Sequence, residues 1–78
     1  LRASTGGASQ LEVEGVTVRQ VIGNLELLHP GIQSRLVDGG RLRPNISVAI
    51  DGEISSLGLL EAVEPNSEIH FLTAIKGG

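Results

Sequence analysis

A single stretch with helical periodicity limits the folds open to this chain. Apolar residues recur at the spacing of one helix face between residues 18 and 28, and Pro30 forces His29 away from helical dihedrals. Thr17 and Gln20 form the T-x-x-Q pattern of a capping box at the other end. The sequence therefore predicts one amphipathic helix that must bury its apolar face against another layer. The apolar positions are Val18, Val21, Ile22, Leu25 and Leu28.

The segments on either side of this helix have the alternation of β-strands. Residues 10–14 alternate polar and apolar, residues 45–50 place three β-branched residues on one face, and residues 68–75 are the most strand-like run. Asp51-Gly52 is a strong signal for a two-residue hairpin turn. Strands that wrap one amphipathic helix give a two-layer α+β domain.

Two connections have apolar residues of their own. Residues 31–44 are predicted to contain a short helical turn anchored by Ile32 and Leu36, followed by an exposed loop at Gly39-Gly40. Residues 57–63 are predicted to form a second short turn whose leucines cover one end of the sheet.

Size and composition exclude several classes of protein. A chain of 78 residues forms one domain, since a second would have too little apolar surface to bury. Phe71 is the only aromatic residue and the net charge is −3, which argues against nucleic acid as a partner. No apolar run approaches the ~20 residues of a membrane span, and no cysteine is present. We expect a cytoplasmic protein with no membrane partner, and the two histidines, His29 and His70, suggest no metal site.

The chain ends on a pair of glycines directly after the last strand-like run. Glycine has no Cβ, so Gly77 and Gly78 can pass through a narrow channel and take dihedrals that other residues resist. We expect a folded domain over residues 1–76 and a reactive tail over residues 77–78. The plainer alternative is an uninformative terminus, because glycines are common at frayed chain ends.

The order of these features resembles the bacterial sulfur-carrier family of the β-grasp (ubiquitin-like) fold. That family includes the small subunit of molybdopterin synthase and the carriers of thiamine and cysteine biosynthesis. The resemblance rests on one central helix, the Ile-Ser-Val-Ala-Ile-Asp-Gly hairpin at 46–52, and the final strand running into the glycines at 77–78. Residues 1–2 (Leu-Arg), 5–7 (Thr-Gly-Gly) and 32–36 look closest to the cysteine and molybdopterin types.

The resemblance implies an ATP-dependent cycle. An enzyme similar to ubiquitin-activating enzymes adenylates the Gly78 carboxylate, and a sulfur donor displaces the adenylate to leave a thiocarboxylate. A biosynthetic partner enzyme, of the cysteine or molybdopterin type, then accepts the sulfur. The chain binds no cofactor itself, since ATP is used by the activating enzyme, and it is a substrate rather than a catalyst.

Alternation along the last strand suggests a docking surface. If Ile69 and Phe71 face the helix, His70 and Leu72 lie on the outer face of the sheet. An exposed leucine next to the tail is similar to the apolar patch with which carriers dock their enzymes, although single exposed leucines are common. Ala74, near the end of this strand-like run, and Lys76, just before the glycines, are placed in the same partner-binding surface.

Two other functions remain open. The first is a protein modifier joined through Gly78 to lysines on target proteins; because Lys76 is the only lysine, chains linked through side chains have one attachment site, beside the reactive tail. The second is an interaction module of the same fold with an inert tail.

The beginning of the chain suggests a missing strand. The resemblance implies a strand before the Thr-Gly-Gly turn that lies mid-sheet beside the last strand, yet only residues 1–4 precede that turn. The chain also begins at Leu1 and contains no methionine. We therefore expect the first strand to be absent from this chain, leaving an edge of the last strand unpaired unless upstream residues or a second chain cover it.

Overall fold

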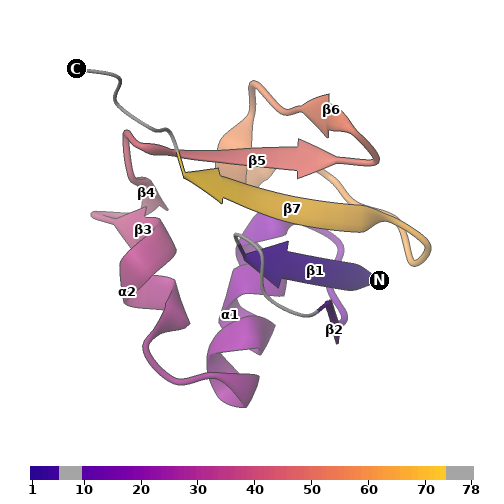
Figure 1. The fold of residues 1–78 in the computed structure, drawn as a ribbon, viewed down its shortest axis with the longest axis horizontal. Helices are drawn as coiled ribbons and strands as arrows, with labels where there is room; N and C mark the ends of the chain where they lie inside the picture. Colours follow the sequence, from indigo (N-terminus) through magenta and orange to yellow (C-terminus); the bar gives the residue numbers. More distant parts are fainter. Residues whose placement is uncertain (6–9, 74–78) are drawn as a thin grey trace.

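In the computed structural model of the protein, a mixed sheet lies over one main helix (Figure 1). The structure describes residues 1–5 and 10–73. The elements are β1 (Arg2–Thr5), β2 (Leu11–Glu12), α1 (Val18–Leu28), α2 (Ile32–Leu36), β3 (Val37–Asp38), β4 (Arg41–Leu42), β5 (Ile46–Ile50), β6 (Glu53–Ile54), the 3₁₀ helix η1 (Gly58–Leu60) and β7 (Glu68–Thr73). The predicted α+β class, with a mixed sheet on one main helix, is confirmed.

The sheet places the last strand in the middle. Within the described residues its order is β2-β1-β7-β5-β6; β1 runs parallel to β7, and the other pairs are antiparallel. β5 and β7 pair from Ile46 opposite Thr73 to Ile50 opposite Ile69. β7 therefore has a hydrogen-bonded neighbour on both sides, and Figure 1 shows it between β1 and β5.

The expectation that the strand beside β7 is absent from this chain is wrong. Residues 2–5 form β1, which pairs in parallel with β7 from Arg2 opposite Glu68 to Thr5 opposite Phe71. β1 also pairs with β2 as a hairpin, so the strand after the turn does not lack its partner. Ala3 points into the core and is 1% exposed.

Helix α1 begins and packs as its sequence predicts. Gln20 N–H donates to Thr17 Oγ1 at 3.3 Å, which is the N-cap bond of a capping box. The Gln20 side chain reaches one residue further back than in that motif, since its Oε1 accepts from Val16 N–H at 3.0 Å. The helix ends at Leu28, and His29 N–H donates to the Leu25 carbonyl at 2.7 Å. Hydrogen bonds therefore mark both the first and the last turn of the helix.

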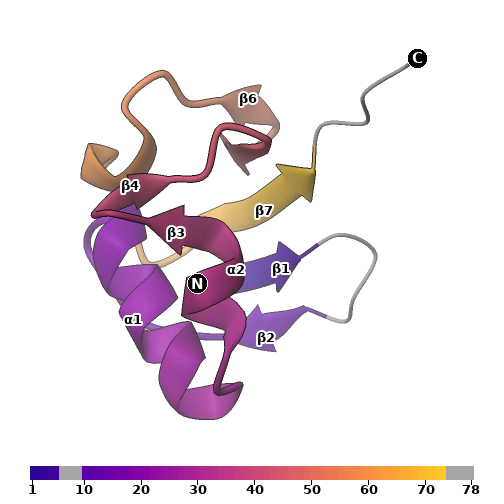
Figure 2. The ribbon, with the colours of Figure 1, turned by 90° about the vertical axis from the view of Figure 1, so that its left-hand side faces the viewer.

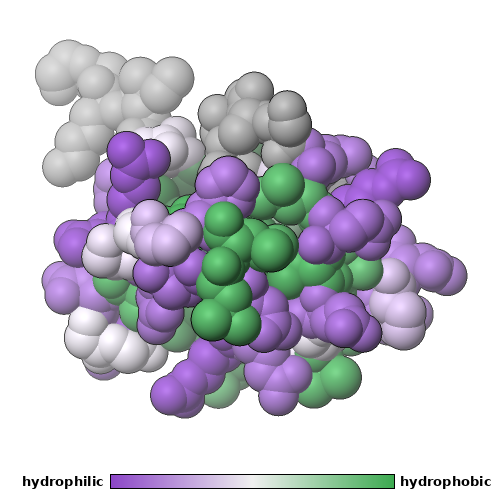
Figure 3. All heavy atoms as spheres, turned by 90° about the horizontal axis from the view of Figure 1, so that it is seen from below, coloured by the Kyte–Doolittle hydropathy of each residue, from purple (hydrophilic) through white to green (hydrophobic). Residues whose placement is uncertain are grey.

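The buried face of α1 is narrower than predicted. Val18, Val21, Ile22 and Leu25 are buried, but Leu28 is 54% exposed because the last turn extends past the sheet. Leu27, next to it, is exposed as well. On the side of the molecule seen in Figure 3, hydrophobic side chains gather in the middle of the surface and hydrophilic ones surround them.

Two connections differ from their predictions. The segment expected to be an exposed loop is a small hairpin, β3–β4, in which Gly39 and Gly40 take positive φ angles of 61° and 81°. The leucines around η1 were predicted to cover one end of the sheet. Leu59 is buried, but Leu60 is 75% exposed. Among the described residues, no helix is long and apolar enough to cross a membrane.

The core is aliphatic apart from one ring. Phe71 is the largest fully buried side chain and lies with residues from β1, α1, β5 and β7. Among the described residues, the buried members of this core are Leu1, Ala3, Val13, Val18, Val21, Ile22, Leu25, Leu36, Val48, Leu59, Val63, Ile69 and Phe71. Ile69 and Phe71 of β7 are thus packed in the core close to the point where the described chain ends.

Candidate functional site

The candidate site begins where β7 ends. Thr73 is the last residue that the structure describes, so the predicted site residues Ala74, Lys76, Gly77 and Gly78 lie outside the described residues. Their roles, and the division into a domain over 1–76 and a tail over 77–78, stay predictions. What the structure defines is the rigid strand from which this segment continues.

The two faces of β7 are arranged as the alternation predicts. Ile69 and Phe71 are buried against the core. His70 is half-buried and Leu72 is 42% exposed, and both belong to the opposite, outer face of the sheet. The orientation of these two predicted docking residues is therefore confirmed, and their role in docking stays a prediction.

Strand register joins His70 to a short apolar row across the sheet. His70 lies opposite Ala49 of β5, and Ala49 lies opposite Ile54 of β6. Directly paired residues share a face, so Ile54, which is 62% exposed, projects on the same side as Leu72. The sequence analysis missed Ile54, although the Asp-Gly turn fixes this pairing once it is taken as a two-residue hairpin.

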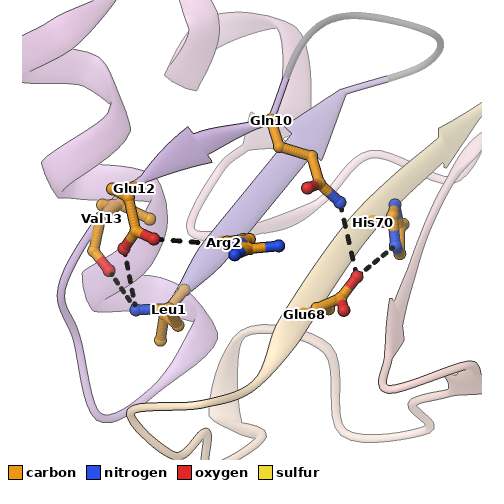
Figure 4. Close-up of polar contacts among 7 residues, drawn as sticks. All are labelled: Leu1, Arg2, Gln10, Glu12, Val13, Glu68 and His70. Atoms are coloured by element: carbon orange, nitrogen blue, oxygen red, sulfur yellow. Dashed lines mark hydrogen bonds and ion pairs between the residues drawn. The ribbon is translucent and has the colours of Figure 1, made fainter.

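Polar contacts hold the imidazole of His70 on this face. Ser4 Oγ lies 2.7 Å from His70 Nδ1, with the donor set by the tautomer of the ring. His70 Nε2 lies 3.9 Å from Glu68 Oε1, and Gln10 Nε2 donates to the same oxygen at 3.4 Å (Figure 4). The ring is thereby tied to side chains of β1 and β7.

A charged row runs beside the apolar one. Arg2 lies opposite Glu12 on one side and Glu68 on the other. Arg2 Nε is 3.7 Å from Glu12 Oε1 (Figure 4), and both side chains are largely exposed. Exposed ion pairs contribute little to stability, on the order of 0–1 kcal/mol. This row therefore adds little to the stability of the sheet, and its main effect is the charge pattern on this face.

The polar side chains of the described residues are spread over the surface rather than gathered into a metal-binding group. Within residues 1–5 and 10–73, no group of three or more His, Cys, Asp or Glu side chains is placed to hold a metal ion. Arg43 is bound locally, since its Nε donates to the Ser34 carbonyl at 2.9 Å. The arrangement instead presents a strand end, an apolar row and a charged row on one face.

A small β-grasp domain whose central strand leads to a C-terminal glycine pair defines the class of ubiquitin-like carriers. The profile of the ThiS family matches residues 1–78. The chain belongs to the ThiS family, a sulfur-carrier family of the β-grasp fold.

Two similar proteins, both sulfur carriers by name, agree with this family. The chain is 32% identical to the sulfur carrier protein CysO of Mycobacterium tuberculosis over 83 residues, covering all of this chain and 89% of the relative. The CysO protein of Mycobacterium bovis matches at the same identity and coverage.

Solved structures share the fold. A crystal structure of the BexX/CysO complex of Amycolatopsis orientalis superposes with a TM-score of 0.84 and 32% identity, covering 92% of this chain and 83% of that one. The structure of SAMP1 from Haloferax volcanii gives a TM-score of 0.74 at 25% identity, covering 99% and 97%. The predicted β-grasp fold and the predicted family are confirmed.

Proposed function

We propose that this protein carries sulfur as a thiocarboxylate on Gly78, in the cytoplasm, and donates it to a biosynthetic enzyme of the cysteine type. One observation carries the proposal: in a chain that the ThiS family matches over its whole length, the mid-sheet strand β7 ends at Thr73, shortly before the Gly77-Gly78 pair in the sequence. The relatives named CysO favour cysteine synthesis over the molybdopterin alternative.

The chemistry requires activation because a carboxylate is a poor acylating agent. A carboxylate oxygen of Gly78 attacks the α-phosphorus of ATP, pyrophosphate leaves, and an acyl adenylate forms. The sulfur of a donor then attacks the acyl carbon, and AMP leaves with the electron pair of the broken C–O bond. These steps belong to an adenylating enzyme, so this chain is their substrate and not their catalyst.

The fold supports this division of labour. β7 is paired on both sides up to Thr73, and two glycines without Cβ atoms at the end of the sequence suit entry into another protein's active site. Leu72 and His70, on the outer face beside the tail, are proposed to contact the partner enzymes, together with Ala74 and Lys76. A relative in complex with a second protein, BexX/CysO, supports the existence of such a partner.

The test is reconstitution with an activating enzyme from the same organism. The protein is incubated with that enzyme, ATP and a sulfide donor, and its intact mass is measured. We expect the mass to rise by the replacement of one oxygen by sulfur, with release of pyrophosphate. An unchanged mass with an enzyme that is active on another carrier would contradict the proposal.

The control separates this function from the two alternatives. Deletion of Gly78 removes the reacting carboxylate from its place and should abolish pyrophosphate release, while the circular dichroism spectrum stays unchanged. Adducts to lysines of other proteins, in place of a thiocarboxylate, would support the protein-modifier function. Neither product would support an interaction module with an inert tail.

A further inference from the structure

A cleft of about 880 Å³ opens at the end of the sheet where β7 ends. Figure 2 looks onto this end of the molecule, with α2 nearest the viewer. The floor contains the buried side chains of Leu25 and Phe71, and the half-buried side chains of Leu11, Ile32 and Ile46 line the opening. A volume of this size lies within the range of roughly 300–1,000 Å³ typical of ligand sites. The cleft is therefore large enough to receive side chains of another molecule.

The rim of this cleft is positively charged. Arg35 is exposed and lines the cleft, and no aspartate or glutamate occurs among the described residues that line it. Arg41 lies in β4, and Arg43, directly after it, donates its backbone N–H to the Leu36 carbonyl of α2 at 2.9 Å. Among the ion pairs between described residues, Arg43 reaches Asp38 at 4.0 Å, and none includes Arg35 or Arg41.

The opposite end of the sheet is acidic. Asp51, Glu53 and Glu68 are exposed there, and the Asp51 N–H donates to the Glu68 carbonyl at 2.8 Å. Glu26 lies near α2, but its carboxylate accepts backbone N–H groups and does not line the cleft. The charges of the domain are thus separated along the sheet, although the whole chain is acidic with a net charge of −3. A partner with an acidic surface is drawn to the cleft end and repelled by the other.

An enzyme that acts on Gly78 must come close to this cleft. Thr73 lines it, and residues 74–78 follow Thr73 in the sequence. Five residues span at most roughly 17 Å, so the active site that holds the carboxylate lies within that distance of the rim. The surface of the enzyme around its active site is therefore the partner surface that this end of the domain meets.

We propose that the cleft binds a segment of the activating enzyme in which an aliphatic side chain adjoins an aspartate or glutamate. The aliphatic side chain leaves water against Leu11 and Ile32, and the carboxylate pairs with Arg35. This contact is separate from the outer face of the sheet, since Leu72 and His70 do not line the cleft. The inference rests on the proposed function, which requires such an enzyme.

The experiment measures the association and dissociation rates of the full chain with the activating enzyme of the same organism, without ATP, by surface plasmon resonance. Arg35→Glu should slow association about tenfold at low salt, because it reverses a charge that steers the partner. The difference should shrink near 1 M salt, where the Debye length falls to about 3 Å. Arg19→Glu is the matched control: it makes the same charge change at an exposed position of α1 that does not line the cleft, and its association rate should stay within about twofold.

A second variant tests the apolar half of the cleft. Ile32→Ala removes part of the lining without changing any charge, so it should speed dissociation several-fold and leave the salt dependence of association unchanged. Circular dichroism checks that each variant is folded. In the unmodified chain, the methyl resonances of Leu11 and Ile46 should shift when the enzyme is added.

Each result decides the matter. Arg35→Glu associating as fast as the unmodified chain would overturn the inference, and so would equal slowing by Arg19→Glu, because net charge alone would then explain it. Methyl shifts that depend on the concentration of this protein without enzyme would assign the cleft to a second copy and also overturn it. If Arg35→Glu formed the thiocarboxylate as fast as the unmodified chain at low carrier concentration, the proposed function would stand and this docking site would not. Binding at the cleft with no thiocarboxylate formed would give the reverse.

Discussion

The hydroxyl oxygen of Ser4 lies 2.7 Å from Nδ1 of His70, across the parallel pair of β1 and β7. The two residues are 66 positions apart in the sequence. This contact joins the first strand to the last and holds the imidazole on the outer face. His70 lies two residues before Leu72 in β7. The pairing of β1 with β7 therefore also positions a side chain of the proposed docking surface.

Removing this hydroxyl should weaken the domain measurably. Ser4→Ala deletes one part-buried hydrogen bond, so we expect a loss of about 0.5–1.5 kcal/mol in the free energy of unfolding. Urea denaturation measures it. The control is Ser47→Ala, an exposed serine of β5 on the same face, which should change stability by less than about 0.5 kcal/mol. Equal losses in the two variants would show that the Ser4–His70 contact contributes nothing specific.

Adjacent residues of β7 should separate docking from stability. Leu72→Glu is expected to weaken binding to the activating or sulfur-accepting enzyme, with a stability change within about 0.5 kcal/mol, since the side chain is partly exposed. Phe71→Ala removes a buried ring and should lower the free energy of unfolding by about 3–5 kcal/mol. Calorimetric titration and thermal unfolding measure the two effects.

The opposite pattern would contradict this assignment of faces. If Leu72→Glu unfolded the domain while Phe71→Ala left it stable, the strand would face the other way. If Leu72→Glu kept full affinity for both partners, the outer face would not be their docking surface.

Features encoded by neighbouring residues could be predicted from the sequence. The N-cap bond from Gln20 N–H to Thr17 Oγ1 joins residues three positions apart and could be predicted, whereas Val18 N–H, in the same first turn, donates to the distant Glu61 carbonyl. The Asp51-Gly52 turn is similar, because both residues take the positive φ angles, 52° and 89°, that the predicted hairpin turn requires. The alternation that buries Phe71 and exposes Leu72 is equally local.

Features that depend on distant partners could not be predicted. β1 has four residues, too few to show a periodicity that would mark it as a strand before β7 and β2 pair with it. The burial of one leucine of η1 and the exposure of Leu60 depend on where α1 passes. The apolar row that includes Ile54 exists only once three strands lie side by side.

Glu26 gives the domain a predictable response to acid. Its carboxylate accepts backbone hydrogen bonds from Gln33 N–H and Gly31 N–H, each at 2.9 Å at closest, at the start of α2. These bonds, Gln33's first, hold the pKa of Glu26 below its ordinary value. A lowered folded-state pKa means that the contribution is fully present above the unfolded pKa and is lost as the pH falls through the folded one.

The corresponding variant tests this pH dependence. Glu26→Gln should destabilise the protein at neutral pH, and the difference from the unmodified protein should shrink as the pH falls below about 4.3, the usual value for a glutamate. Urea denaturation at a series of pH values measures it. Glu53→Gln, in the β5–β6 hairpin, removes the same charge without touching α2, and its difference should not follow that course. A Glu26→Gln effect that is constant with pH would rule out the carboxylate as its origin.

The place of β1 in the sheet predicts that one small side chain near the beginning of the chain is critical. Ala3 is 1% exposed and lies opposite Ile69 of β7, so a charged group there has no water and no partner. Ala3→Asp should lower the free energy of unfolding by about 3 kcal/mol or more. The effect should be smaller at low pH, where a buried carboxyl is neutral. Arg2→Ala is the control, since this exposed neighbour should cost no more than about 1 kcal/mol. Guanidinium denaturation compares the two, and an Ala3→Asp protein as stable as Arg2→Ala would mean that residues 2–5 do not fill the place beside β7.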